Sequence, residues 1–380
     1  MNRAFTDFYS DHGARLASRN YNLDLLFQAR EALFLSLGLP PSLLKGCKIL
    51  EFGPGTGHYS VFNFLQNPKN YIFVEGVEEA RSVLKRRLDK YKKHNVDWSI
   101  NDELFEDFET TELYDLVIAE SCIPHQKNPD SIFRHFTKYV APGGVILITT
   151  ASGVSYLSET LRRLIRDKLI SPMETAENQL KLLTPVFSTH LDNLRGVSRT
   201  AEEWILDAII QPLGEVRLFS IAEAIEAVGR DFSVLGTAPD LIQDYAWYRT
   251  LRNPAEHSRK NSLSAYYKNV CSLLDVRYPG GYLDADAGTR LEASCNQLWN
   301  SMATFETEVG ATWDSVFETL ESIEKNLIEI NSSSLSAFQE IVDWLCGESY
   351  DATKMKEFPH WWGVGQQHIA FYRNKHLIDS

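Results

Sequence analysis

The sequence predicts an α/β protein whose core is a doubly wound, mostly parallel sheet with large α-helical insertions. Two observations carry this prediction. Between residues 48 and 150, short strand-like runs alternate with stretches of helical spacing. Strands separated by helices of this length pair in parallel, because each connection must cross over the sheet. Beyond residue 150, strand-like runs are rare and long segments with helical spacing take their place.

The first 45 residues are predicted to be helical. Leu23, Leu26 and Leu33 recur at helical spacing, and Pro40-Pro41 end the pattern. The core strands follow at 48–52, 71–75, 96–100, 115–119 and, after a turn at 141–144, at 145–150.

Two long helical insertions are expected before the chain ends. In the second one, Val316, Leu320 and Ile323 begin a 4-3-4-3 spacing that is typical of a helix packed on another helix. Strand-like runs at 232–236 and 367–372 return the chain to the sheet. The predicted division is an N-terminal helical segment (1–45), an α/β core (46–150), a helical insertion (151–228), a core strand region (229–250), an acidic helical insertion (251–356) and a C-terminal core strand (357–380).

The chain is acidic, with 51 Asp and Glu against 38 Lys and Arg and a formal net charge of −13. Residues 301–350 hold ten carboxylates and a single base, Lys325. A block of this charge repels nucleic acid and anionic membranes, so neither is expected as a partner. We interpret the block as a solvated helical face; docking of a basic partner protein is the alternative.

The sequence does not indicate a secretion signal, a membrane span or a metal site. The N-terminus has no apolar stretch of signal-peptide type, and the longest apolar runs fall far short of the ~20 residues that cross a bilayer. The five cysteines are widely spaced and form no C-x-x-C pair, which indicates neither a disulfide framework nor a zinc site. We expect a soluble, cytoplasmic protein without bound metal.

A glycine-rich loop, Glu51-Phe52-Gly53-Pro54-Gly55-Thr56-Gly57, directly follows the first predicted strand. Its glycines let the backbone turn tightly and let a ligand lie against it without a Cβ in the way. The second strand ends 18 residues after Gly57 in Glu75, where nucleotide-binding α/β folds place an acid on a ribose diol. The third strand ends at Asn101-Asp102, and the fourth at Glu120-Ser121.

This ordered set of motifs over residues 48–150 resembles the class I S-adenosylmethionine-dependent methyltransferases. The resemblance implies S-adenosylmethionine as the cofactor, with residues 1–45 as a helical lid. It implies that Gly53, Gly55 and Gly57 lie under the methionine part and the ribose. It also implies contacts from Glu51 to the methionine amino group, from Glu75 to the ribose hydroxyls, from Asp102 to the adenine amino group, and from Glu120 and Ser121 to the region of the sulfonium.

Two points of the motif leave alternatives open. Asn101 is a near alternative to Asp102 for the adenine contact. A nicotinamide dehydrogenase is the main rival of the methyltransferase, but its G-x-G-x-x-G fingerprint requires a glycine where this chain has His58. The loop also begins with Glu51 where the resembled family more often has Asp, which moves the carboxylate by one methylene.

Methyl transfer from a sulfonium is an in-line displacement, and a hydroxyl nucleophile must also lose a proton to a base. His125, on the loop after the fourth strand, is the first candidate for this base; capping or packing of that loop is the alternative. Glu120 and His58 are the next candidates. We interpret Cys122 as a packing residue, because this reaction needs no covalent intermediate on the enzyme.

Two further features bear on the acceptor. The bases Arg162, Arg163, Arg166 and Lys168 could hold an anionic group or form an exposed helix face. Trp361-Trp362, flanked by glycines and glutamines, could line a pocket for a sugar or another polar compound, or pack a strand edge.

The function expected from the sequence is methyl transfer from S-adenosylmethionine to an oxygen or nitrogen of a small polar metabolite, with a sugar or natural-product hydroxyl favoured. Two alternatives remain open. One is a non-catalytic cofactor-binding or assembly protein that docks a partner through the acidic block, and the other is an NAD-dependent oxidoreductase. The oligomeric state is not predicted.

Overall fold

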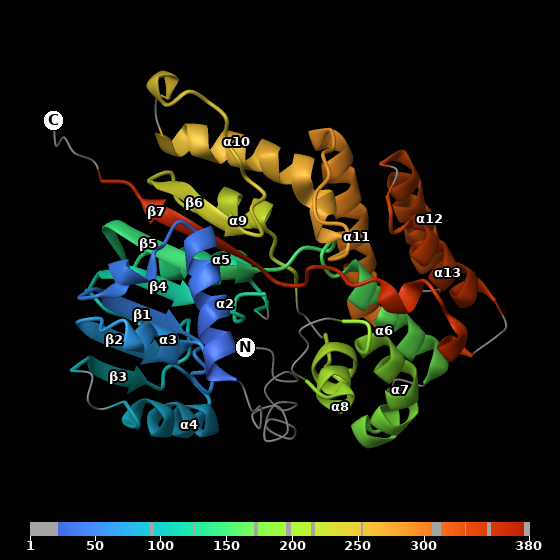
Figure 1. Cartoon of the computed structure of the whole chain (residues 1–380), viewed down its shortest axis with the longest axis horizontal. Helices are drawn as coiled ribbons and strands as arrows, with labels where there is room; N and C mark the ends of the chain where they lie inside the picture. Colours follow the sequence, from blue (N-terminus) through green and yellow to red (C-terminus); the bar gives the residue numbers. More distant parts are fainter. Residues whose placement is uncertain are drawn as a thin grey trace. The chain divides into compact units, whose positions relative to one another are not determined.

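The computed structural model describes residues 22–91, 95–124, 126–170, 174–194, 199–213, 217–251, 254–305, 313–330, 332–347 and 351–375. These residues form two compact units (Figure 1). The α/β unit is built from residues within 22–150, 219–266 and 366–375. The helical unit is built from residues within 151–218 and 267–365.

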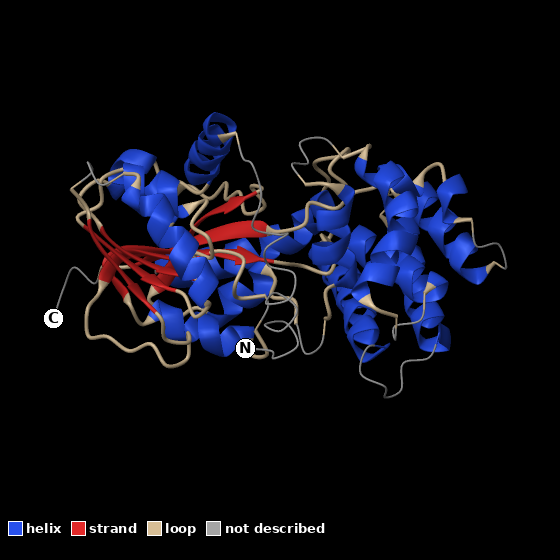
Figure 2. Ribbon diagram, turned by 90° about the horizontal axis from the view of Figure 1, so that it is seen from below, coloured by secondary structure: helices blue, strands red, loops and turns tan. Residues whose placement is uncertain are grey.

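The α/β unit contains a seven-stranded sheet with the strand order β3-β2-β1-β4-β5-β7-β6. The strands β1 to β5 pair in parallel, and β7 runs antiparallel to both of its neighbours. Figure 2 shows helices on both faces of this sheet. The predicted fold class, a doubly wound and mostly parallel sheet with large helical insertions, is confirmed. The strands are β1 (Lys48–Phe52), β2 (Asn70–Val74), β3 (Asp97–Asn101), β4 (Tyr114–Ala119), β5 (Val140–Thr150), β6 (Phe232–Ala238) and β7 (Gln367–Arg373).

Three helices of the α/β unit begin at recognisable sequence signals. The Asn22 side chain accepts hydrogen bonds from two backbone amides of the first helical turn, Pro129 occupies the first turn of its helix, and Ser220 forms a capping box with Glu223. The helix that begins after Ser220, α9, packs on α5. Residues 219–228, which were predicted as the end of the first helical insertion, therefore belong to the α/β unit. The helices are α2 (Leu23–Ser36), α3 (Ser60–Leu65), α4 (Glu78–Asp89), α5 (Pro129–Thr137) and α9 (Ile221–Ala227), and α10 (Pro254–Asn269) continues the chain into the helical unit.

The turn predicted at 141–144 is instead part of β5, which already begins at Val140. Gly143 has a φ of +85°, and the pairing of β4 with β5 shifts register after Tyr114. A glycine at positive φ allows such an irregularity, so the strand continues through residues that usually form a turn. The prediction was therefore correct for the second part of the strand and wrong for its start.

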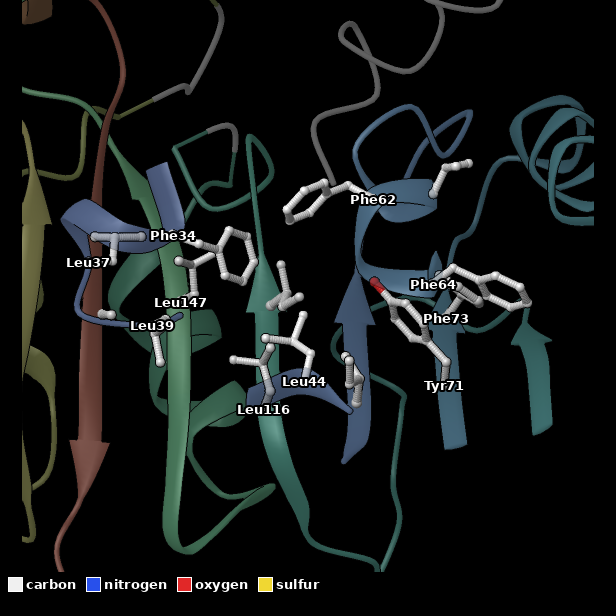
Figure 3. Close-up of a cluster of buried hydrophobic side chains, with 14 of the residues drawn as sticks. Phe34, Leu37, Leu39, Leu44, Phe62, Phe64, Tyr71, Phe73, Leu116 and Leu147 are labelled. Atoms are coloured by element: carbon white, nitrogen blue, oxygen red, sulfur yellow. The ribbon is translucent and has the colours of Figure 1, made fainter. Parts of the chain in front are cut away.

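One face of the sheet carries the main hydrophobic cluster, to which α2, α3 and α4 contribute (Figure 3). Successive side chains of a strand point to opposite faces, so the cluster uses every second residue. Two positions beyond the buried Ile49, Phe73 and Ile118, the same alternation places three glutamates on this face. The cluster includes Phe34, Leu37, Leu39, Leu44, Phe62, Phe64, Tyr71, Leu84, Leu88, Leu116, Leu147 and Ala370.

The helical unit is held together by helix-on-helix contacts, among them α11 with α12 and α12 with α13. As the spacing predicts, Val316, Leu320 and Ile323 are buried, with at most 1% exposure. Glu318 and Glu321 on the same helix are exposed, so these two carboxylates of the acidic block lie on the surface. The helices are α6 (Leu157–Leu169), α7 (Ala176–Leu191), α8 (Ala201–Trp204) with a π-helical turn at Ile205–Ile210, α11 (Ala285–Phe305), α12 (Trp313–Glu329) and α13 (Leu335–Cys346).

None of the described helices is both long enough and apolar enough to cross a membrane.

Candidate active site

Three glutamates lie on one face of the sheet at the carboxyl ends of neighbouring parallel strands. They are Glu51 in β1, Glu75 after β2 and Glu120 after β4, and each is 7% exposed or less. Burying a carboxylate is unfavourable unless hydrogen bonds or opposite charges compensate for the lost water. The partners of each glutamate therefore define the site.

The glycine loop after β1 has its three glycines at positive φ, with values of +66°, +54° and +76° for Gly53, Gly55 and Gly57. A Cβ on Gly57 would clash with Leu84 of α4, and one on Gly53 would lie 3.0 Å from Cys122. These two glycines let the loop pack closely against its neighbours. Within the described part of the chain, a Cβ on Gly55 would meet no atom within 4 Å, so of the three glycines this one leaves room for a ligand to approach its backbone.

Glu75 ties the glycine loop to the end of β2. Its Oε2 accepts a hydrogen bond of 2.9 Å from the amide of Gly55, and its Oε1 accepts one of 2.9 Å from the amide of Val77. Burial raises the pKa of Glu75, and the two backbone hydrogen bonds partly oppose that effect. Each carboxylate oxygen has a further lone pair, so the group can still accept a bond from a ligand hydroxyl beside the open loop.

Glu51 is held by two hydroxyl groups. Ser60 Oγ donates to its Oε1 at 2.9 Å, and the hydroxyl of Tyr71 donates to its Oε2. Burial raises the pKa of Glu51 to about 7, against the opposing effect of the hydrogen bond from Tyr71. The tyrosine hydroxyl also accepts a hydrogen bond of 3.2 Å from Asn63, so the carboxylate belongs to a chain of buried polar groups.

Glu120 forms a buried ion pair with Arg30 of α2. The two guanidinium nitrogens Nη1 and Nη2 donate to Oε1 and Oε2 at 2.6 and 2.8 Å, and His368 Nε2 lies 3.2 Å from Oε1. Burial alone would raise the pKa of Glu120, but Arg30 and His368 together lower it to about 2. The carboxylate is therefore ionised at every physiological pH.

The remaining residues proposed for the cofactor lie at the carboxyl ends of β3 and β4. Ser121 has a φ of +59°, and its Oγ donates to Gln366 Oε1 at 2.9 Å. Asp102 is exposed and directly follows β3, while Asn101 Oδ1 accepts a hydrogen bond of 2.8 Å from the amide of Glu103. No distance to the glycine loop distinguishes Asp102 from Asn101, so both stay candidates for the adenine contact.

Cys122 is buried, and its Sγ lies 3.6 Å from the carbonyl oxygen of Phe52. Burial raises the pKa of the Cys122 thiol, so a thiolate does not form near neutral pH, as expected for a packing residue.

The described residues contain no group of three His, Cys, Asp or Glu side chains that could hold a metal ion. His125, the first candidate base, lies outside the described residues.

Four residues of this cluster were missed from the sequence: Arg30, Ser60, Tyr71 and His368. Arg30 offered a signal, because it stands between Phe27 and Phe34 on the otherwise apolar stripe of α2. A base on such a stripe must find a buried acid or carbonyl group. For His368, the sequence indicated only a position near the start of a strand and no contact with Glu120.

The basic residues of α6 neither hold an open anion site nor form an exposed face. Arg162 is fully buried, donates to the carbonyl oxygens of Ser158 and Trp361, and stacks 3.7 Å from the ring centroid of Trp362. Arg163 and Arg166 donate to Gln211 O and Ile209 O at the end of the π-helical turn. Lys168 donates to the carbonyl oxygens at the carboxyl end of α13.

The two tryptophans near the end of the chain do not line an open pocket. Trp361 and Trp362 are 0% and 2% exposed, and the indole nitrogen of Trp361 donates to Leu274 O at 2.6 Å. Of the two interpretations offered by the sequence, packing is therefore correct, although the rings pack inside the helical unit and not along a strand edge.

Comparison with known proteins identifies the domain that carries the glycine loop. A family model described as a methyltransferase domain matches residues 19–183. A curated relative, malonyl-[acyl-carrier protein] O-methyltransferase 2 of Ilyobacter polytropus, is 27% identical over 137 residues, which are 35% of this chain and 49% of the relative. This chain thus spans about half the length of the curated relative that it matches. The family match confirms the resemblance to class I methyltransferases that the glycine loop predicted.

Solved structures with local similarity include an S-adenosylmethionine-dependent methyltransferase from Clostridium acetobutylicum, at 18% identity over 41% of this chain and 60% of that chain, with a TM-score of 0.29. Another is the CcbJ methyltransferase from Streptomyces caelestis, at 20% identity over 33% of this chain and 50% of that chain, with a TM-score of 0.28.

Proposed function

We propose, from the class I methyltransferase domain that residues 19–183 carry, that this protein transfers a methyl group from S-adenosylmethionine to an oxygen or nitrogen of a small polar metabolite. A hydroxyl of a sugar or another polar natural product is the acceptor that we favour. Oxygen is further supported by the curated relative, whose name describes O-methyl transfer.

The observation that carries the proposal is the open position at Gly55 beside Glu75. The loop has room for a ligand at that glycine, and the Glu75 carboxylate that binds the Gly55 amide keeps lone pairs for a ribose hydroxyl. A nucleoside-containing cofactor therefore fits the residues present. When bound, S-adenosylmethionine supplies a methyl group activated by a positively charged sulfur.

The other residues of the site have roles that follow from their surroundings. Glu51 and its hydroxyl partners would receive the methionine amino group, directly or through water, because both carboxylate oxygens keep an acceptor site. Ser121 would lie at the reacting end of the cofactor, and Asp102 or its neighbour Asn101 at its adenine. Glu120 is unsuited to remove a proton, because its pKa is about 2, and we assign it the task of orienting its neighbours.

The test is transfer of a labelled methyl group. The protein is incubated with methyl-labelled S-adenosylmethionine and a metabolite extract, and labelled products are sought by mass spectrometry. We expect one labelled small molecule with the parent protein and none with Gly55→Val. Tight binding of S-adenosylhomocysteine without any transfer would favour the non-catalytic alternative, and stabilisation by NADH alone would favour the oxidoreductase.

A further inference from the structure

The last strand of the sheet brings a histidine to the site from the far end of the chain. His368 is the second residue of β7, and β7 runs antiparallel to β5, so it begins at the edge where β5 ends. In register, His368 pairs with Thr149 of β5, and β5 lies next to β4. The start of β7 therefore lies at the same edge of the sheet as Glu120.

The imidazole of His368 contacts Glu120 and is partly exposed. Its Nε2 lies 3.2 Å from Glu120 Oε1, and its side chain keeps 22% of its surface exposed. Glu120 itself is 6% exposed and cannot turn away, because Arg30 holds both of its oxygens. Among the described residues, Nδ1 of His368 makes no hydrogen bond.

The charges around the ring select one tautomer. A carboxylate oxygen only accepts hydrogen bonds, so the nitrogen that faces Glu120 carries a proton, and in the neutral ring the lone pair is therefore on Nδ1. The neighbouring elements add Arg30 from α2 and Glu51 from β1, whose charges also act on Glu120. On the other side, β6 places the uncharged Ala238 opposite His368. An imidazole oriented by a fixed carboxylate is a common arrangement for a general base.

We propose that His368 is the general base of the proposed methyl transfer, oriented by Glu120, with Arg30 as a positioning residue. The inference rests on the proposed function and adds the residue that receives the proton. The acceptor hydroxyl oxygen forms a bond to the methyl carbon, and the bond from that carbon to sulfur breaks with its electron pair left on sulfur. The hydroxyl proton passes to Nδ1 of His368, which leaves an imidazolium facing the Glu120 carboxylate.

The decisive variants are His368→Gln and His368→Ala. A glutamine can still donate to Glu120 but cannot take up a proton, so His368→Gln separates proton transfer from packing. His257→Gln is the matched control. His257 lies on α10, its Nε2 pairs with Asp244 Oδ2 at 2.8 Å, and neither residue belongs to the candidate site. S-adenosylhomocysteine binding by calorimetry and transfer of labelled methyl into a metabolite extract in a single turnover are measured for each.

We expect all three variants to bind S-adenosylhomocysteine within about threefold of the parent. His368→Gln and His368→Ala should lose at least about a hundredfold in the rate of transfer, the contribution of a positioned base. His257→Gln should retain the parent rate. Added imidazole should restore part of the rate of His368→Ala but not of His368→Gln, whose side chain fills the space. A purely structural role for His368 gives no such rescue.

Nitrogen-15 NMR of labelled histidine provides a second readout that does not depend on turnover. We expect the Nε2–H tautomer for His368 in the parent and a mixture of tautomers in Glu120→Gln. A parent in the Nδ1–H tautomer, or a full transfer rate in His368→Gln, overturns His368 as the base while the methyltransferase proposal stands. A parent that binds no S-adenosylhomocysteine overturns the proposed function, and the base with it.

Discussion

Arg30 and Glu120 are 90 positions apart in the sequence and form two parallel hydrogen bonds, of 2.6 and 2.8 Å, between α2 and the end of β4. Their side chains are 4% and 6% exposed. The Arg30 guanidinium also lies 4.9 Å from the ring centroid of Tyr59 and 5.2 Å from that of Phe34. The pair fixes α2 over the strand ends. Because both charges are buried, removing one of them would leave the other buried without a compensating charge.

Arg30→Met should lower the free energy of unfolding by about 3–5 kcal/mol, because it leaves the Glu120 charge buried without its main partner. The double variant Arg30→Met/Glu120→Gln should regain much of that loss. Urea unfolding followed by circular dichroism measures both. Arg290→Met is the control, because the side chains of Arg290 and its partner Glu329 are 51% and 56% exposed. Loss of this exposed ion pair should change the free energy of unfolding by less than about 1 kcal/mol. A parent-like Arg30→Met would show that the pair is not buried in solution.

Gly55→Val should abolish the thermal stabilisation of the protein by S-adenosylhomocysteine. Valine at a φ of +54° is strained, so a second glycine with the same strain is needed as a control. Gly46 has a φ of +77°, and a Cβ there would also meet no described residue within 4 Å, but Gly46 precedes β1. Gly46→Val should melt at a lower temperature yet keep the ligand-induced shift. Equal loss of the shift in both variants would mean that strain, and not the blocked approach, prevents binding.

Glu75→Ala should weaken binding of S-adenosylhomocysteine by about 1.5–3 kcal/mol, the range for hydrogen bonds to a charged acceptor. Part of the effect should come from the loop, because the amides of Gly55 and Val77 lose their acceptor as well. Calorimetric titration gives the affinity. Glu112→Ala, which removes an exposed carboxylate paired with Lys48, should bind like the parent. Parent-like affinity in Glu75→Ala would remove Glu75 from the ribose site.

The stability of the parent should contain a contribution that falls between pH 4.5 and 7. Because the pKa of Glu51 is raised from 4.5 to about 7, the folded state binds this proton more tightly than the unfolded chain. That contribution, about 3 kcal/mol, is present below pH 4.5 and is lost as the pH rises through 7. Thermal melting from pH 4.5 to 8 should show it as a difference from Glu51→Gln, which cannot titrate. Curves that stay parallel over this range would contradict the raised pKa.

Glu120 should act in the opposite direction at lower pH. Its pKa is lowered to about 2, so its contribution is present above about pH 4.5 and is lost as the pH falls toward 2. Comparing acid unfolding of the parent with that of Glu120→Gln isolates this effect. The difference between the two should shrink steadily below pH 4.5, and a constant difference would argue against the ion pair with Arg30.

The elements predicted best from the sequence are those whose signal is local. The glycine loop from Gly53 to Gly57 directly follows a strand of mostly buried residues, and a strand followed by closely spaced glycines can be recognised without any distant partner. The same holds for the face of α12 that begins with Val316. The predictions for the bases of α6 failed for the converse reason, and for Trp361-Trp362 the sequence left two interpretations open, of which packing is correct. A run of bases or aromatic rings has the same appearance on a surface as in an interior, and here carbonyl groups from distant helices surround it.

The sequence by itself determined the class of the sheet, the glycine loop and the acid at Glu75. Each of these features is specified by residues that lie close together in the sequence, no further apart than about one strand and one helix. Only the tertiary structure decided that Arg30, Glu120 and His368 meet. Their contact depends on α2 covering the strand ends and on β7 entering antiparallel beside β5. Such contacts between distant segments are selected by the burial of whole faces, because no short stretch of sequence carries enough apolar surface to select a partner alone.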